Sequence, residues 1–116
     1  MTTTIYHNPR CSKSRETLRL ITEQGVEPEV VEYLKTPPDR AQLEAILDML
    51  GLEPRQLMRN KEPEYQELGL DDKSLSRDQL IDAMLAHPKL IERPIVIRNG
   101  KAAIGRPPEK VLDILS

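Results

Sequence analysis

The chain has 116 residues and a net charge of only −2, with its lysines and arginines spread among aspartates and glutamates. This length predicts one domain, and the balanced charge gives no support for a general role on nucleic acids or at membrane surfaces. Trp and Phe are absent and no run of about 18 apolar residues occurs, so we expect an aliphatic core and no membrane span.

The first third of the chain has the pattern of a strand, a helix and a second strand. Thr3–His7 is short and rich in β-branched residues, which favours a strand. Ser12–Gln24 has helical spacing, and Gly25 stands where helices commonly end. Glu29–Tyr33 then predicts another strand. A strand, a helix and a strand in so short a span predict a right-handed βαβ unit.

The middle of the chain is predicted to be helical. Two capping boxes, Asp39 with Gln42 and Ser76 with Gln79, each precede apolar residues at helical spacing. Gly51 is placed to end the first of these helices. The charged stretch between the two lacks a long apolar period and predicts short helical turns and loops.

The last part of the chain predicts a hairpin followed by a helix. Pro94–Arg98 is a strong strand pattern, and Asn99-Gly100 is a specific signal for a tight turn into Lys101–Ile104. A final helix is expected from Pro107 or Pro108 to Leu115.

The order of these elements indicates an α/β protein. An N-terminal βαβ half and a C-terminal ββα half resemble the layout of the thioredoxin-like fold, here as one domain, 1–116, with a helical insertion at about 39–87. In that fold a reactive cysteine follows the first strand, and a proline that is usually cis precedes the third strand. Cys11 and Pro94 occupy these two places.

Cys11 is the only cysteine, and it is predicted to lie at the N-terminus of the first helix. Unpaired N–H groups and the positive end of the helix dipole favour a thiolate there. A thiolate beside a cationic loop can attack an electrophile, and the same loop can hold an anion. One cysteine forms no internal disulfide, and Met1–Thr4 lacks the features of a secretory signal, so we expect a cytoplasmic protein. His87 has no second ligand residue near it in sequence, so no metal site is predicted.

Several spaced segments together resemble the glutaredoxin-coupled arsenate reductases and their relatives, over nearly the whole chain. The first is the run from Ile5 to Arg15, with Cys11 inside it. The others are Tyr33–Pro38, Leu57–Arg59, Glu67–Leu70, His87–Val96 and Ile104–Pro107.

This resemblance implies that Cys11 is the nucleophile and that Arg59, Arg93 and Arg106 converge on a bound oxyanion. It also places His7 near the cysteine as a further catalytic residue, acting either directly as a base or by orienting the loop. The loop residues that are candidates for contact with the substrate are Asn8, Arg10, Ser12, Lys13 and Ser14. Ser14 is in addition placed to donate a hydrogen bond to the Cys11 thiolate.

The activity implied is the reduction of arsenate without a bound cofactor. Cys11 attacks arsenic, glutathione joins as co-substrate, and glutaredoxin resolves the mixed disulfide as arsenite leaves. Guanidinium forks suit this chemistry because paired N–H donors hold oxyanion oxygens and offset their repulsion of a thiolate.

Two other functions remain open at this point. Transcriptional regulators of the Spx type share this fold and bind RNA polymerase, although many carry a Cys-x-x-Cys switch that this chain lacks. A thiol reductase for another substrate is the second alternative, because Ser12-Lys13 replaces the small pair that arsenate reductases tend to have. The acidic residues of the middle region are expected to form a solvated surface; they are Glu62, Glu64, Glu67, Asp71 and Asp72.

Overall fold

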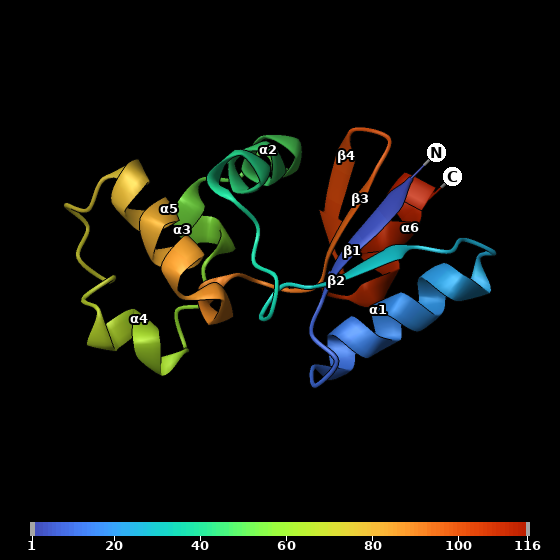
Figure 1. Ribbon diagram of the computed structural model, residues 1–116, viewed down its shortest axis with the longest axis horizontal. Coiled ribbons are helices and arrows are strands. Elements are labelled where there is room, and N and C mark those ends of the chain that lie inside the picture. The colour runs from blue at the N-terminus through green and yellow to red at the C-terminus, as the bar shows by residue number, and fades with distance from the viewer. Residues whose placement is uncertain (1, 116) are drawn as a thin grey trace. The chain divides into compact units, whose positions relative to one another are not determined.

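The computed structural model describes residues 2–115, which divide into a sheet unit and a helical unit (Figure 1). The sheet unit comprises the residues up to Thr36 and those from Arg93 onward, and the helical unit is Pro37–Glu92. The predicted insertion at about 39–87 falls in the helical unit. Met1 and Ser116, the ends of the predicted domain, lie outside the described residues.

The sheet has four strands in the order β2-β1-β3-β4. β1 (Thr3–His7) pairs in parallel with β2 (Glu29–Glu32) and antiparallel with β3 (Ile95–Arg98), and β3 pairs antiparallel with β4 (Lys101–Ile104). All four strands predicted from the sequence are confirmed. Alternate residues of β1 are buried, so His7, at its end, points to the same face as Ile5.

Helices cover one face of this sheet (Figure 1). α1 (Ser12–Glu23) packs against the 3₁₀ turn η2 (Pro108–Val111), and α6 (Leu112–Leu115) packs against β3 and β4. The core between these elements is aliphatic, as predicted; its fully buried members are Ile5, Ile21, Val96 and Val111.

The C-terminal helix differs from the prediction in its first turn. It begins as the 3₁₀ turn η2, in which the Lys110 N–H donates to the carbonyl of Pro107 at 3.1 Å, and becomes α-helical only from Leu112. Short 3₁₀ turns are frequent at the N-termini of α-helices.

Two local predictions for the C-terminal half are confirmed. Asn99 and Gly100 both have positive φ, 55° and 74°, as a two-residue type I′ hairpin turn requires. The Arg93–Pro94 peptide bond is cis. With β1-α1-β2 followed by β3, β4 and a terminal helix, the sheet unit has the thioredoxin-like arrangement.

The helical unit begins with α2 (Arg40–Leu50) and includes α5 (Arg77–Ala86). Both predicted capping boxes are present, with Asp39 and Ser76 as the N-cap residues. Gly51 ends α2 with a φ of 67°, a conformation that glycine adopts without steric cost. The short elements of the unit are α3 (Pro54–Leu57), α4 (Pro63–Glu67) and the 3₁₀ turn η1 (Pro88–Leu90). Within residues 2–115, every helix is too short or too polar to cross a membrane.

Candidate active site

Cys11 lies at the junction between β1 and α1. The chain reverses through a turn in which the Cys11 N–H donates to the Asn8 carbonyl at 3.0 Å. The Asn8 side-chain oxygen accepts from the N–H of Arg10 at 3.0 Å, which stabilises the same turn. Cys11 is the N-cap residue of α1, and its carbonyl accepts the N–H of Arg15. The thiol therefore lies at the end of the helix where the first N–H groups have no hydrogen-bond partner within the helix.

Two arginines from the C-terminal half meet this sulfur. Nη2 of Arg106 lies 3.4 Å from Sγ of Cys11, and the Arg93 side chain also hydrogen-bonds the thiol. Nε of Arg106 donates to the carbonyl of Arg93 at 2.7 Å, which fixes the two arginines relative to each other. Only 8% of the Cys11 surface is exposed, and guanidinium groups of both arginines contact its sulfur.

These contacts lower the pKa of Cys11 below its ordinary value. Burial is the largest single influence and raises this pKa. The backbone N–H of Ser14, the hydrogen bond from Arg93 and the positive charges of Arg93 and Arg106 all lower it, and together they outweigh burial. The structure thus favours the thiolate, which is the nucleophilic form of cysteine.

Close packing holds the segment that carries Arg106. The Gly105 N–H donates to the Pro94 carbonyl at 3.0 Å. A Cβ on Gly105 would lie 2.8 Å from Cγ of Pro94 and closer still to Oγ1 of Thr17. Thr17 is fully buried, and its hydroxyl donates to the Lys13 carbonyl in the first turn of α1. Gly105 therefore lets the arginine segment approach the helix that carries Cys11. Nothing in the sequence marks Thr17 as part of the site, and the one signal for Gly105 is its place directly before Arg106.

His7 and Ser14 form a buried pair beneath the loop. Nδ1 of His7 lies 2.6 Å from Oγ of Ser14, which also accepts the Asn8 N–H at 3.0 Å. Burial, the main cause, and the charge of Arg15 lower the pKa of His7, although Glu32 opposes them. The Ser14 hydroxyl is thus engaged with His7 and Asn8 and not with the Cys11 sulfur suggested by the sequence. Its backbone N–H is the group that acts on the thiol.

The other loop residues lie on the surface. Ser12 and the side chains of Arg10 and Lys13 are exposed, and Nζ of Lys13 pairs with Glu16 at 3.7 Å. Asn8 is partly buried and shapes the turn through its side-chain oxygen. Contacts between these residues and a substrate stay a prediction.

Arg59 lies in the helical unit between two carboxylates. Nε donates to Oε1 of Glu62 at 3.2 Å, and Nη1 donates to Oε1 of Glu92 at 2.6 Å. Burial, the largest influence, lowers the pKa of Arg59, but Glu92 and Glu62 raise it above its ordinary value. Glu62 was expected on a solvated surface, and this was wrong, because Arg59 holds its carboxylate in a partly buried ion pair. The role of Arg59 as an oxyanion ligand stays a prediction.

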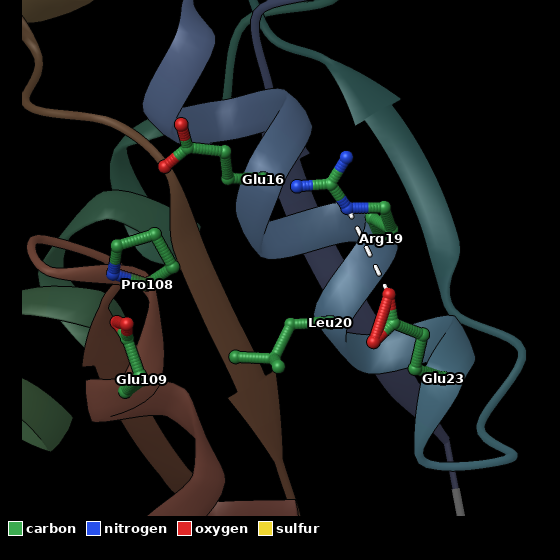
Figure 2. A pocket seen from close by; sticks show the side chains of 6 residues that line it. All are labelled: Glu16, Arg19, Leu20, Glu23, Pro108 and Glu109. Atoms are coloured by element: carbon green, nitrogen blue, oxygen red, sulfur yellow. Dashed lines mark ion pairs between the residues drawn. The ribbon is translucent and has the colours of Figure 1, made fainter.

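A separate hollow in the sheet unit lies between α1 and η2 (Figure 2). Its lining residues are Glu16, Arg19, Leu20, Glu23, Pro108 and Glu109. Three of them are acidic, and Arg19 pairs with Glu23, so this surface repels an oxyanion. Residues 2–115 hold no cluster of three His, Cys, Asp or Glu side chains placed for a metal ion.

A thioredoxin-like sheet with one cysteine of lowered pKa beside two arginines is an arrangement suited to thiolate chemistry. The sequence model of the ArsC family matches residues 6–114, so the chain belongs to the ArsC family.

Relatives of known name and structure agree with this assignment. The chain is 64% identical over 112 residues to the uncharacterized protein YfgD of Escherichia coli (strain K12), covering 96% of this chain and 94% of YfgD. It is 55% identical over 115 residues to an arsenate reductase of Rhizobium meliloti (strain 1021), covering 99% of this chain and 82% of that protein. The solved structure of an arsenate reductase from Vibrio cholerae is 56% identical, with a TM-score of 0.96 and 98% of both chains covered.

Proposed function

We propose that this protein is an arsenate reductase in which Cys11 is the nucleophile and Arg93 and Arg106 bind the oxyanion. The observation that carries the proposal is the sulfur itself, 3.4 Å from Nη2 of Arg106 and with its pKa lowered. Membership of a family with arsenate reductases at 54–55% identity supports the same substrate.

The first step joins sulfur to arsenic. The Cys11 thiolate attacks arsenate, an As–S bond forms, and one arsenate oxygen leaves as hydroxide or, after protonation, as water. The guanidinium groups of Arg93 and Arg106 offset the repulsion between the thiolate and the oxyanion, and they stabilise the charge that moves onto the remaining oxygens. His7 and Ser14 hold the loop in place through their buried hydrogen bond. We assign Arg59 to the oxyanion as a third ligand.

The second step supplies the electrons. A glutathione thiolate attacks Sγ of Cys11, the S–As bond breaks, and its electron pair stays on arsenic, which leaves as arsenite. Cys11 is then in a mixed disulfide with glutathione, and glutaredoxin reduces it by thiol exchange. One protein cysteine suffices, because the small thiol provides the second sulfur. Glutathione and glutaredoxin operate in reducing compartments, so we assign the reaction to the cytoplasm.

The test is arsenite formation by the purified protein with arsenate, glutathione and glutaredoxin. We expect turnover in the wild type and none above background in Cys11→Ser. Omission of glutaredoxin should also stop turnover; if another thiol carrier replaces it, the coupling is wrong while the chemistry at Cys11 stands. A wild-type protein that forms no arsenite overturns the proposal and favours a thiol reductase with another substrate.

A further inference from the structure

Thr17 is a buried polar residue of α1 that has no part in the chemistry proposed for Cys11. Its hydroxyl donates to the Lys13 carbonyl at 2.7 Å and lies 3.4 Å from the carbonyl oxygen of Gly105, in the segment between β4 and η2. A hydroxyl has one hydrogen, so the two carbonyl oxygens share it and both lose it when the hydroxyl is removed. Thr17 therefore links α1 to the residue that directly precedes Arg106.

The contact between Thr17 and Gly105 is tight. A Cβ on Gly105 would lie 3.0 Å from Cγ2 of Thr17, closer still to its Oγ1, and 2.8 Å from Cγ of Pro94. On the side of Pro94, the Gly105 N–H donates to the Pro94 carbonyl at 3.0 Å. Gly105 is thus held between α1 and the start of β3, and the Thr17 side chain forms the contact on the side of α1.

Arg106 has little freedom relative to Gly105. Its N–H donates to the Ile104 carbonyl at 2.9 Å, and its Nε donates to the Arg93 carbonyl at 2.7 Å. Its Nη2 lies 3.4 Å from Sγ of Cys11. Because hydrogen bonds fix the backbone on both sides of Gly105, a shift of Gly105 away from α1 also shifts Arg106. Such a shift lengthens the contact between Nη2 and the sulfur.

We infer that Thr17 is a positioning residue for Arg106: its hydroxyl holds Gly105 against α1, so that Nη2 of Arg106 reaches the sulfur of Cys11. The helix fixes Thr17 relative to Cys11, since Cys11 is the N-cap residue of the same α1. The inference rests on the proposed function where arsenate turnover is concerned, whereas the contact between Arg106 and the thiol exists without substrate.

The experiment measures the pKa of Cys11 in Thr17→Val from the pH dependence of alkylation by iodoacetamide. Valine keeps the branched shape but removes the hydroxyl, so both carbonyl oxygens lose their donor. We expect the pKa of Cys11 to rise by about one unit, the lower end of what a neighbouring charge contributes. In the arsenate assay, the acidic limb of the kcat/KM profile should move to higher pH by the same amount.

Two other threonine variants separate this role from a general effect of removing a helix hydroxyl. Thr17→Ser keeps the hydroxyl and should restore a pKa of Cys11 close to that of the wild type. The matched control is Thr22→Val, because the exposed Thr22 also belongs to α1 and its hydroxyl donates to the Arg19 carbonyl at 2.8 Å. Equal rises of the pKa in Thr17→Val and in either of these two variants overturn the proposal.

Gly105→Ala tests the same contact from the other side, and it decides the question if Thr17→Val does not fold. The added Cβ pushes the arginine segment away from Thr17, so the pKa of Cys11 should rise. A folded variant with an unchanged pKa overturns the proposal. In an Arg106→Gln background, Thr17→Val should cause no further rise, because the side chain that it positions is gone. A full rise in that background also overturns it.

Failure of this inference can be told from failure of the proposed function. If the wild type forms no arsenite, the proposed function is wrong, and the alkylation measurements, which need no arsenate, still decide about Thr17. If the wild type forms arsenite and folded Thr17→Val has the pKa of the wild type, only the positioning role is wrong.

Discussion

Arginine has different partners in the two units of this molecule. In the sheet unit, Arg93 and Arg106 contact the sulfur of Cys11 and lower its pKa. In the helical unit, Arg59 contacts the carboxylates of Glu62 and Glu92, which raise its own pKa. The first arrangement activates a nucleophile, while the second fixes an arginine in place.

The difference shows that the function of a guanidinium group depends on the groups that it contacts. Beside a thiol, its charge stabilises the anionic form and so increases nucleophilicity at neutral pH. Between two carboxylates, its charge is already balanced, and the ion pairs mainly fix the orientation of the guanidinium group. Substitutions that keep or remove the charge should therefore act differently in the two units.

The largest effect is expected for Arg106→Lys. Lysine keeps the positive charge but loses the planar fork, which both donates to the Arg93 carbonyl and reaches Cys11. We expect kcat/KM for arsenate to fall on the order of tenfold to a hundredfold, as for loss of a charged hydrogen bond in the transition state. The control is Arg98→Lys, whose side chain contacts Thr3. Equal kinetics in the two variants would exclude a specific role for the Arg106 fork.

The next largest effect is expected on the stability of the Ser14→Ala variant. This change leaves Nδ1 of His7 and the N–H of Asn8 without their buried partner. We expect the free energy of unfolding in urea to fall by about 1–3 kcal/mol. The pKa of Cys11 should stay low, because the backbone N–H at position 14 remains. The exposed Ser12→Ala is the matched control, and an equal loss in both would show that the buried hydroxyl contributes nothing.

The pKa of Cys11 can be compared between variants of an arginine from each unit. Arg106→Gln removes a charge beside the sulfur and should raise this pKa, whereas Arg59→Gln should leave it unchanged, since Arg59 is not among the groups that lower it. The rate of alkylation by iodoacetamide as a function of pH measures both variants. A pKa that moves equally in both would mean that long-range charge, and not contact, controls the thiol.

The smallest effect is a pH dependence of stability through His7. Its folded pKa is lowered, mainly by burial, so the unfolded chain binds a proton where the folded chain does not. This contribution to stability is complete above the unfolded pKa of about 6.5 and is lost as pH falls from there toward the lower folded pKa. His7→Gln should remove this part of the dependence of the free energy of unfolding on pH. Parallel stability curves for wild type and variant between pH 7 and pH 5 would contradict it.

The elements that were predicted correctly have signals close together in the sequence. The capping boxes at Asp39 and Ser76 and the Asn99-Gly100 turn each depend on a few neighbouring residues, whose backbone preferences decide the local structure. Cys11 at the start of α1 was predictable for the same reason, since it follows a strand pattern and precedes a helix pattern.

Contacts between distant residues could not be predicted in this way. Thr17 and Gly105 approach each other across 88 positions, and nothing near either residue specifies the other. The Arg59–Glu62 pair is local, but its partial burial accompanies a second ion pair of Arg59 with Glu92, 33 positions away, which nothing near Glu62 specifies. The direction of the Ser14 hydroxyl depended on the fold of β1 over α1, which buries His7 beside it. The convergence of Arg93 and Arg106 on Cys11 was implied chiefly by family resemblance, with one supporting sign in the sequence, since each precedes a proline in the half expected to face the thiol.

The most direct test of this account is a titration of the Cys11 thiolate by its ultraviolet absorbance in the wild-type protein. Because Arg93, Arg106 and the N-terminus of α1 outweigh burial, we expect the inflection to fall below about 8.5, the ordinary value for a cysteine. An inflection at or above that value would show that burial prevails and that the sulfur is not activated.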